Sequence, residues 1–337
     1  MKTFSPTLLL WYQQNKRDLP WRHTKDPYKI WLCEIIMQQT RIAQGLEYYN
    51  RFVRTFPSPR FLARASEDQV LKLWQGLGYY SRARNLHAAA KSMNGVFPKT
   101  YEGVCALKGV GDYTAAAICS IAYDMPYAVV DGNVYRVLSR VFGISTPIDS
   151  TEGKKQFTAL AQKLLDKQFP GDFNQAMMDF GALVCTPQTP QCEECPLAKK
   201  CEAYRRGLQE KLPVKAQKTK VITRYFHYIY VEQGKFTWIR QRGAGDVWQH
   251  LYEVPLVEGK NEKLPSTTLK KWFGSAKVVA VGKPVKHVLS HQIIYANMYK
   301  VILPAACKIL AGFQKVPAKD LPKYAVSRLM QKLLERV

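Results

Sequence analysis

The chain has 337 residues, of which 47 % are hydrophobic, so it is long enough for two or three domains and can bury a sizeable core. Its 50 Lys and Arg residues outnumber its 26 Asp and Glu residues, giving a formal net charge of +24. This composition excludes global disorder as the default state. The charge surplus predicts a polyanionic partner, with nucleic acid as the first candidate. An anionic membrane surface and a merely basic soluble surface are the alternatives.

In the first two hundred residues, capping residues, prolines and glycines mark the expected ends of several helices. Ser5 followed by Pro6 is typical of a helix start. Asp26-Pro27 opens an apolar stretch, and Ser66 opens a helix that ends at Gly76. Further helices are predicted over residues 83–93, 114–122, 132–141, 153–168 and 173–184.

The character of the sequence changes after residue 207. Residues 208–222 include several lysines and one proline, which predicts a basic linker. Beyond the linker, alternating segments rich in aromatic and β-branched residues predict strands. These strands cover residues 225–232, 236–242, 277–281 and 293–303, and a helix is predicted over residues 321–337. We therefore predict a mainly α domain followed by a smaller α+β domain.

Four of the eight cysteines lie within 17 residues, with the spacing Cys-x6-Cys-x2-Cys-x5-Cys. No secretion signal accompanies them, which favours metal ligation over disulfides. Zinc sites with four cysteines usually contain two separated Cys-x2-Cys pairs, and only one such pair is present. The spacing favours a [4Fe–4S] cluster and leaves zinc as the alternative. The expected ligands are Cys185, Cys192, Cys195 and Cys201, whereas Cys33, Cys105, Cys119 and Cys307 are expected to be buried small hydrophobes.

Residues 107–117 read Leu-Lys-Gly-Val-Gly-Asp-Tyr-Thr-Ala-Ala-Ala. Gly109 and Gly111 permit a tight turn with exposed backbone N–H groups, and the helix that follows presents its positive end to a phosphate. The pattern predicts a helix–hairpin–helix that binds DNA phosphates regardless of sequence. An ordinary connection between two helices is the alternative.

Two carboxylates occur in unusual surroundings. Glu34 interrupts the apolar run 31–37, which predicts burial and a raised pKa, with an exposed helical Glu as the alternative. Asp131 lies in Val-Val-Asp-Gly-Asn-Val, where the alternative is a simple turn or helix cap. Two carboxylates in opposed environments suit cleavage of a glycosidic bond, because one protonates the leaving group and the other stabilises an oxocarbenium-like centre.

Together, the cysteine spacing, Leu-Lys-Gly-Val-Gly and Val-Asp-Gly-Asn-Val resemble the helix–hairpin–helix DNA glycosylases of the endonuclease III superfamily. Within that superfamily, Trp31 to Thr40, Gly76 to Leu86 and Phe173 to Met178 resemble the adenine DNA glycosylases of the MutY type. The resemblance covers residues 7–205 and weakens over the C-terminal third. It implies a monomer that acts on duplex DNA containing adenine mispaired with 8-oxoguanine or guanine, with a [4Fe–4S] cluster and no membrane association.

The resemblance also implies roles for individual residues. Glu34 would protonate adenine N7, and Asp131 would stabilise the sugar cation and help to recruit water. Tyr113 and Asn133 would support this site. Because position 113 is a lysine in the bifunctional endonuclease III type, Tyr113 predicts a monofunctional enzyme with weak lyase activity at most.

Further residues would surround the mispair. Arg22, Met37 and Gln175 would border the adenine pocket. Gln39 and Tyr80 would wedge into the duplex at the oxidised guanine, because a flipped adenine leaves a space to be filled. Ordinary core positions are the alternative for Tyr79 and Tyr80. The competing functions are an oxidised-pyrimidine glycosylase with lyase activity and a non-enzymatic iron–sulfur protein that binds DNA.

The C-terminal part resembles the Nudix-like recognition domain of the same family. Trp248 to Pro255 weakly matches a core element, and no acidic Nudix helix appears, so we do not expect pyrophosphate hydrolysis. Ser290 and His291 align with a family loop that probes 8-oxoguanine, although Leu289 replaces the usual Phe and removes a possible stacking contribution. A capped turn with a surface His is the alternative.

The expected organisation has three parts. Residues 1–207 form the glycosylase domain, with a six-helix barrel at 22–125 and an iron–sulfur subdomain at 1–21 and 126–207. Residues 208–222 are the linker, and residues 223–337 form the Nudix-like domain. No apolar run approaches about 18 residues, and the start of the chain lacks the features of a signal peptide. We therefore expect a cytoplasmic, bacterial-type and nucleoid-associated protein, or one located elsewhere inside a cell.

Overall fold

The computed structural model describes residues 3–216, 221–264, 266–304 and 311–337. The chain divides into two compact units. The first contains Met1–Arg64 and Asn85–Gln217, and the second contains Ala65–Arg84 and Lys218–Val337. Residues 65–84, which the sequence places in the helical domain, therefore belong to the same unit as the C-terminal part.

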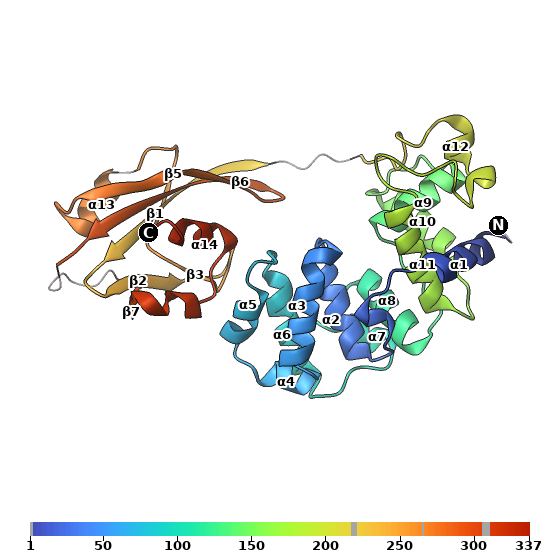
Figure 1. The fold of residues 1–337 in the computed structure, drawn as a ribbon, viewed down its shortest axis with the longest axis horizontal. Helices are drawn as coiled ribbons and strands as arrows, with labels where there is room; N and C mark the ends of the chain where they lie inside the picture. The colour runs from blue at the N-terminus through green and yellow to red at the C-terminus, as the bar shows by residue number, and fades with distance from the viewer. Residues whose placement is uncertain (1–2, 217–220, 265, 305–310) are drawn as a thin grey trace. The chain divides into compact units, whose positions relative to one another are not determined.

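All regular secondary-structure elements among the described residues of the first unit are helices (Figure 1). Several predicted helices are present within a few residues of their expected ends, because capping side chains and prolines mark them locally. The helices are α1 (Phe4–Asn15), α2 (Pro27–Met37), α3 (Ile42–Thr55), α4 (Pro59–Arg64), α6 (Ser81–Ser92, which begins in the second unit), α7 (Tyr101–Cys105), α8 (Asp112–Tyr123), α9 (Gly132–Phe142), α10 (Thr151–Leu164), α11 (Pro170–Leu183) and α12 (Glu202–Arg206), with short 3-10 helices η1 (Pro20–Arg22) and η2 (Ala198–Lys200).

Helix α2 is the central helix of this unit. Its N-cap Asp26 accepts a hydrogen bond from the backbone N–H of Tyr28, and Pro27 occupies its first position. Seven of its eleven residues are buried, and it packs against α3 and α8. A helix that is apolar around most of its circumference must be enclosed by its neighbours. Glu34, in the middle of α2, is therefore packed among buried neighbours, whereas Lys29 near its start stays partly exposed.

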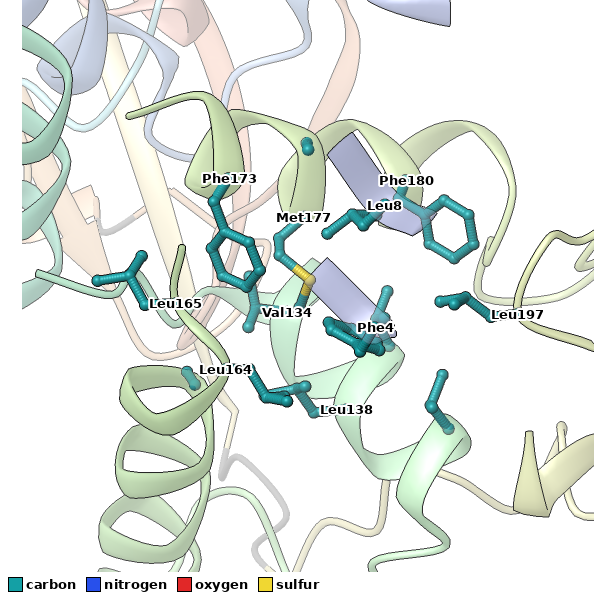
Figure 2. Packing of buried hydrophobic residues seen from close by; sticks show 14 of the residues in the cluster. Phe4, Leu8, Val134, Leu138, Leu164, Leu165, Phe173, Met177, Phe180 and Leu197 are labelled. Atoms are coloured by element: carbon teal, nitrogen blue, oxygen red, sulfur yellow. The ribbon is translucent and has the colours of Figure 1, made fainter. Parts of the chain in front are cut away.

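A second packing centre joins the beginning of the chain to α9, α10 and α11 (Figure 2). Phe4 and Leu8 of α1 pack with Val134 of α9 and Phe180 of α11. Leu197, from the loop that carries the cysteines, joins the same cluster, and three of the cysteines lie against it. The apolar core therefore positions the cysteine loop beside α9 and α11.

Two local predictions in this unit are wrong. Ser5 does not cap α1, because Thr3 is the N-cap and the Ser5 hydroxyl donates to the carbonyl of Leu164. Residues 208–216 are not a free linker, because the Leu212 side chain is buried and the Ala216 N–H donates to Asp149. Residues 217–220 of the predicted linker lie outside the described residues, and residue 222 already begins a strand.

The second unit contains two sheets, as shown in Figure 1. The larger sheet has the order β4-β1-β6-β5, with β1 and β6 parallel and the other neighbours antiparallel. The smaller sheet has the order β3-β2-β7. The strands are β1 (Ile222–Glu232), β2 (Phe236–Gln241), β3 (Tyr252–Glu253), β4 (Leu256–Gly259), β5 (Val278–Val288), β6 (Gln292–Ile302) and β7 (Gln314–Pro317), and the helices are α5 (Glu67–Trp74), α13 (Ser266–Phe273), η3 (Ala318–Lys323) and α14 (Arg328–Leu334).

The predicted helix over residues 321–337 is only partly correct. The α-helical part is α14, which the Ser327 side chain caps, and Pro322 lies in the preceding 3-10 turn. Leu329 and Leu333 are buried in the core on one face of the larger sheet. Within the described part of the chain, none of the helices combines the length and the apolar character needed to cross a membrane.

Side-chain contacts explain why residues 65–84 belong to the second unit. His250 Nδ1 lies 2.5 Å from the carboxylate of Glu67, and the Tyr252 hydroxyl donates to Asp68 at 3.1 Å. The ammonium group of Lys72 donates to the carbonyl of Tyr324 at 3.2 Å. Helix α5 and the segment after it therefore contact the C-terminal part through polar groups, and no local sequence pattern predicts these contacts.

Candidate active site

Glu34 lies in the middle of the buried helix α2. Burial raises the pKa of its carboxyl group to about 7. A hydrogen bond from the Tyr113 hydroxyl opposes this rise, and the negative charge of Asp131 adds to it. The residue is half-buried, so part of it remains accessible. A carboxyl group with such a pKa can carry a proton at neutral pH and donate it to a ligand.

Asp131 is the N-cap of α9. One carboxylate oxygen accepts a hydrogen bond from the Val134 N–H, and the other accepts one from the Asn133 amide, both at 2.8 Å. Burial raises the pKa of Asp131, but these hydrogen bonds oppose the rise. The helix-cap alternative is thus geometrically correct. Asp131 also lies close enough to Glu34 for its negative charge to raise the pKa of the Glu34 carboxyl group.

Tyr113 stands at the start of α8 and connects this site to α11. Its hydroxyl is hydrogen-bonded to Glu34 and lies 3.4 Å from the Met178 sulfur. Burial raises its pKa well above the ordinary value, as do the negative charges of Glu34 and Asp131. The phenol therefore remains protonated at neutral pH and acts as a hydrogen-bond donor. The structure thus brings Glu34, Asp131, Tyr113 and Asn133 together.

A chain of hydrogen bonds leads from Asp131 through Asn133 and Arg136 toward the cysteines, and no local sequence pattern predicts the role of Arg136. The Asn133 side-chain oxygen accepts a hydrogen bond from Arg136 Nη2 at 2.8 Å. Arg136 Nε in turn donates to the backbone carbonyl of Cys185 at 2.7 Å, and its Nη2 also donates to the carbonyl of Gly181 at 2.7 Å. Arg136 is one helical turn after Asn133, so the pair lies on one face of α9.

The three residues expected around a base pocket have different surroundings. Arg22 ends η1, and its side chain is only 9 % exposed because Asp179 of α11 binds it. Gln175 is buried and accepts a hydrogen bond of 3.3 Å from the Tyr12 hydroxyl. Met37 ends α2, and its sulfur lies only 2.5 Å from the position that a Cβ on Gly45 would occupy.

The predicted hairpin connects α7 to α8. Gly109 has a φ of 82°, and a Cβ there would lie 2.7 Å from the Cβ of Asn85. Both observations require glycine at this position. Gly111 is the N-cap of α8, and open space surrounds the position of its missing Cβ. The hairpin therefore presents an unobstructed helix N-terminus.

The four clustered cysteines line a single apolar pocket. No histidine or carboxylate side chain is among the residues that line it, so thiols are its only strong metal ligands. Arg140, which is 2 % exposed, donates to the carbonyls of Leu212, Thr186 and Pro187 and approaches the sulfur of Cys185 at 3.5 Å. Among the described residues, no three His, Cys, Asp or Glu side chains are placed to coordinate a single metal ion.

The other cysteines differ in their surroundings. Cys33 and Cys119 are buried, as expected, and Cys105 is half-buried. Cys307 lies outside the described residues.

The residues expected to contact the opposite base lie in both units. Gln39 follows α2, is exposed and has a φ of 53°. Ser290 and His291 are exposed in the turn between β5 and β6. The Ser290 hydroxyl lies 2.7 Å from the hydroxyl of Tyr79.

Tyr80 does not have the exposure that a wedge into DNA requires. Only 4 % of it is exposed, and its hydroxyl donates to the carbonyl of Val326 at 3.2 Å. The core alternative therefore describes Tyr80. Its neighbour Tyr79 is 49 % exposed and has a φ of 44°, which is uncommon for a residue with a side chain. The sequence does not distinguish Tyr79 from Tyr80, because two adjacent tyrosines in a loop share the same local pattern.

Known families match both units. A family model for HhH-GPD superfamily base excision DNA repair proteins matches residues 32–167, the range that contains Glu34, Tyr113 and Asp131. A NUDIX domain model matches residues 226–336. The expected combination of a helix–hairpin–helix domain with a smaller Nudix-like domain is confirmed.

Individual proteins agree with the family models. The adenine DNA glycosylase of Buchnera aphidicola subsp. Acyrthosiphon pisum is 32 % identical over 340 residues, which cover 98 % of this chain and 97 % of the relative. The adenine DNA glycosylase of Homo sapiens is 46 % identical over 222 residues, covering 62 % of this chain and 41 % of the human protein. The solved structure of a thermostable thymine-DNA glycosylase has a TM-score of 0.57 at 32 % identity and covers 61 % of this chain and 96 % of its own. The chain therefore belongs to the adenine DNA glycosylase family, within the helix–hairpin–helix superfamily of base excision DNA repair proteins.

Proposed function

We propose that this protein hydrolyses the N-glycosidic bond of adenine mispaired with 8-oxoguanine or guanine in duplex DNA. The observation that carries the proposal is the cluster of Glu34, Asp131 and Tyr113, in which Glu34 has a pKa of about 7. The base cannot be reached inside the duplex, so adenine must rotate out of the stack before the reaction.

Glu34 acts as the general acid. Its proton is transferred to adenine N7, which makes the base a better leaving group. The C1′–N9 bond then breaks, and the bonding electrons leave with the base. Asp131 acts in its ionised form, stabilises the positive charge on the sugar and accepts a proton from the attacking water. The water oxygen bonds to C1′ and completes the hydrolysis.

Tyr113 and Asn133 support these two groups. The Tyr113 hydroxyl fixes the Glu34 carboxyl by a hydrogen bond, and Asn133 fixes the Asp131 carboxylate at 2.8 Å. A phenol cannot form a Schiff base with the sugar, so the product is an intact strand with an abasic site.

The remaining residues recognise the substrate. Arg22, Met37 and Gln175 border the adenine pocket, where a guanidinium, a thioether and an amide offer both polar and apolar contacts. On the opposite strand, Gln39 and Tyr79 enter the duplex beside the oxidised guanine. Tyr79 takes the wedge role expected of Tyr80, because Tyr79 is exposed and Tyr80 is buried.

The base opposite adenine is read by the turn between β5 and β6. Ser290 and His291 contact 8-oxoguanine there, and Ser290 does so from its position 2.7 Å from Tyr79. Leu289 is half-buried and packs against the core of the second unit, so this apolar side chain supports the turn.

DNA phosphates bind at the hairpin. The backbone N–H groups around Gly109 and Gly111 face a phosphate, and the N-terminus of α8 adds a favourable dipole. The net charge of +24 supplies the wider attraction. DNA binding should therefore weaken steeply as the salt concentration rises. An affinity that does not change with salt would show that the positive charge does not drive binding.

Cys185, Cys192, Cys195 and Cys201 bind a [4Fe–4S] cluster. Four thiols around one apolar pocket without other strong ligands fit this cofactor. When bound, the cluster supplies a rigid crosslink for the loop and does not take part in hydrolysis. Iron and sulfide analysis together with the visible absorption of purified protein tests this assignment, and colourless, fully active protein without iron would overturn it.

A single-turnover assay tests the function. Duplexes containing A:8-oxoguanine, A:G, A:C or thymine glycol separate adenine excision from oxidised-pyrimidine excision. Glu34→Gln and Asp131→Asn should each lower the excision rate about 10²-fold to 10⁴-fold and largely spare DNA binding. Excision at the wild-type rate by either variant would refute the assigned role. Efficient nicking of the abasic product without heat or alkali would contradict a monofunctional reaction.

A further inference from the structure

The loop at residues 75–80 connects α5 to α6 and carries the exposed Tyr79. Its backbone conformation is unusual, because Gly78 and Tyr79 have φ values of 74° and 44°. Glycine adopts such a value readily, whereas a residue with a side chain does so at a cost in free energy. Tyr79 is 49 % exposed, so burial in the core does not hold it. Specific contacts must therefore maintain this conformation.

Arg82, in the first turn of α6, makes three contacts around this loop. Its guanidinium carbon lies over the Tyr79 ring, 5.6 Å from the ring centre. The same carbon lies over the ring of Trp74, the last residue of α5, at 5.0 Å from the ring centre. Arg82 Nη2 also donates a long hydrogen bond of 3.4 Å to the carbonyl of Gly78. One side chain thus contacts the end of α5, the turn and the exposed ring.

The Gly78 carbonyl receives a second donor from α5. It accepts a 2.9 Å hydrogen bond from the indole N–H of Trp74, which has no exposed surface. This carbonyl belongs to the peptide group that leads into Tyr79, and the orientation of that planar group depends on the φ of Tyr79. Donors from two helices therefore fix the peptide plane, and with it the unusual φ of Tyr79.

Arg82 is suited to this task because it is buried and charged. It is 9 % exposed, and although burial lowers its pKa to about 10, the guanidinium stays protonated at neutral pH. A desolvated cation interacts more strongly with an aromatic face than an exposed cation does. A lysine would not be equivalent, because its ammonium is a point charge that cannot cover two rings and donate to the carbonyl at once.

The other end of the Tyr79 side chain is also held. Its hydroxyl lies 2.7 Å from the hydroxyl of Ser290. The neighbouring Tyr80 hydroxyl accepts a 3.3 Å hydrogen bond from the Gly76 N–H and donates to the carbonyl of Val326 at 3.2 Å. The loop is therefore fixed by side chains of its own unit before any ligand binds.

We propose that Arg82 is a positioning residue for recognition of the base opposite adenine, because its guanidinium holds the Tyr79 ring in the conformation that enters the duplex. The inference rests on the proposed function, since it takes Tyr79 as the side chain that enters beside 8-oxoguanine. Arg82 acts through Tyr79 and makes no contact with the DNA itself. A side chain that is already held in its bound conformation loses less conformational entropy on binding.

The first test compares excision from A:8-oxoguanine and A:G duplexes in single-turnover reactions of the full-length protein with its cluster. Arg82→Met keeps the length of the side chain and removes the charge and the donors. The preference for A:8-oxoguanine should fall about 5-fold, the loss expected for a desolvated cation–π contact. Arg328→Met is the matched control, because Arg328 is an exposed arginine of the same unit that is hydrogen-bonded to Gln331. Its preference should equal that of the wild type.

A double-mutant cycle shows whether Arg82 acts through Tyr79. Tyr79→Ala removes the ring, so adding Arg82→Met to it should change the preference by less than about 1.5-fold. A residue that merely stabilised the fold would have the same effect with or without the ring. An equal effect of Arg82→Met in both backgrounds would therefore overturn the proposal.

Hydrogen–deuterium exchange of the DNA-free protein gives a readout that does not depend on catalysis. In Arg82→Met, the backbone amides of residues 76–80 should exchange faster, and those of β1 and β6 should exchange at the wild-type rate. If Arg82→Met does not fold, Arg82→Lys takes its place, because the proposal requires a planar guanidinium. A folded Arg82→Lys variant with wild-type preference and wild-type exchange would overturn it.

The outcomes separate this inference from the function on which it rests. If the wild type prefers A:8-oxoguanine and a folded Arg82→Met variant keeps that preference, the inference fails and the function stands. If the wild type excises no adenine, the function fails. Exchange at residues 76–80 then still decides whether Arg82 holds the loop, because faster exchange in Arg82→Met would support this role and unchanged exchange would overturn it.

Discussion

The Tyr113 hydroxyl is hydrogen-bonded to the carboxyl group of Glu34 and favours the ionised form of that carboxyl. Removing the hydroxyl should therefore raise the pKa of Glu34 above its value of about 7. The protonated carboxyl is the active form of a general acid, and the rate falls as pH rises through its pKa. Tyr113→Phe should thus shift the alkaline limb of the pH–rate profile to higher pH. A shift to lower pH in single-turnover measurements would contradict this assignment.

Arg136 links the Asp131 side of the active site to the cysteine loop. Replacing it with Leu removes the hydrogen bonds to Asn133, Gly181 and the carbonyl of Cys185. Because hydrogen bonds from charged groups contribute about 1.5–3 kcal/mol each, excision should fall at least about tenfold, with a lower iron content per chain. Arg205→Leu is the control, because Arg205 is an exposed arginine near the same loop that pairs with Glu202. Equal losses of excision activity and iron in both variants would show that Arg136 has no specific role in linking the active site to the cysteine loop.

The two hairpin glycines should respond differently to alanine. Gly109→Ala introduces a side chain at a φ of 82°, against Asn85, and should lower the free energy of unfolding by about 2 kcal/mol and weaken DNA binding. Gly111→Ala meets no neighbouring atom within 4 Å and should cost less than about 1 kcal/mol. Denaturant unfolding and duplex binding of both variants measure the difference. Equal stabilities would show that the hairpin relaxes around the added methyl group.

Adjacent tyrosines provide a test of lesion recognition. Tyr79→Phe removes the hydroxyl that meets Ser290, so preference for A:8-oxoguanine over A:G should fall about 3-fold to 10-fold. Tyr80→Phe removes a buried hydrogen bond to Val326 and should cost about 1 kcal/mol of stability without changing that preference. Ser290→Ala should reproduce the effect of Tyr79→Phe. Loss of preference in Tyr80→Phe alone would reverse the assignment of the two tyrosines.

Several features were predictable because their causes are local. Helix ends follow from Asp26, Pro27 and Ser66, whose capping effects depend on the next few residues. The hairpin glycine at 109 follows from a backbone conformation that other residues avoid. The burial of α2, and with it the raised pKa of Glu34, follows from an apolar run with a single charge.

Local signals were misleading where distant segments compete for the same groups. Ser5 and Pro6 are typical of a helix start, yet the Ser5 hydroxyl binds Leu164, which lies 159 residues away. The basic segment at 208–216 has the composition of a linker, yet Leu212 is buried in the first unit. In each case the local pattern is typical of a group exposed to water, whereas in the folded protein a distant segment contacts that group.

The sequence by itself determined the combination of domains, the four clustered thiols, the hairpin and the two carboxylates, because spacing and periodicity encode them within short segments. Only the tertiary structure decided which tyrosine is exposed, which arginine connects Asn133 to the cysteine loop and which carboxylate compensates Arg22. Asp179 and Arg22 are separated by 157 residues along the chain, and their pairing depends on the packing of α1 against α11. Such a contact leaves no local pattern, because the two partners share no secondary-structure element and no sequence neighbourhood.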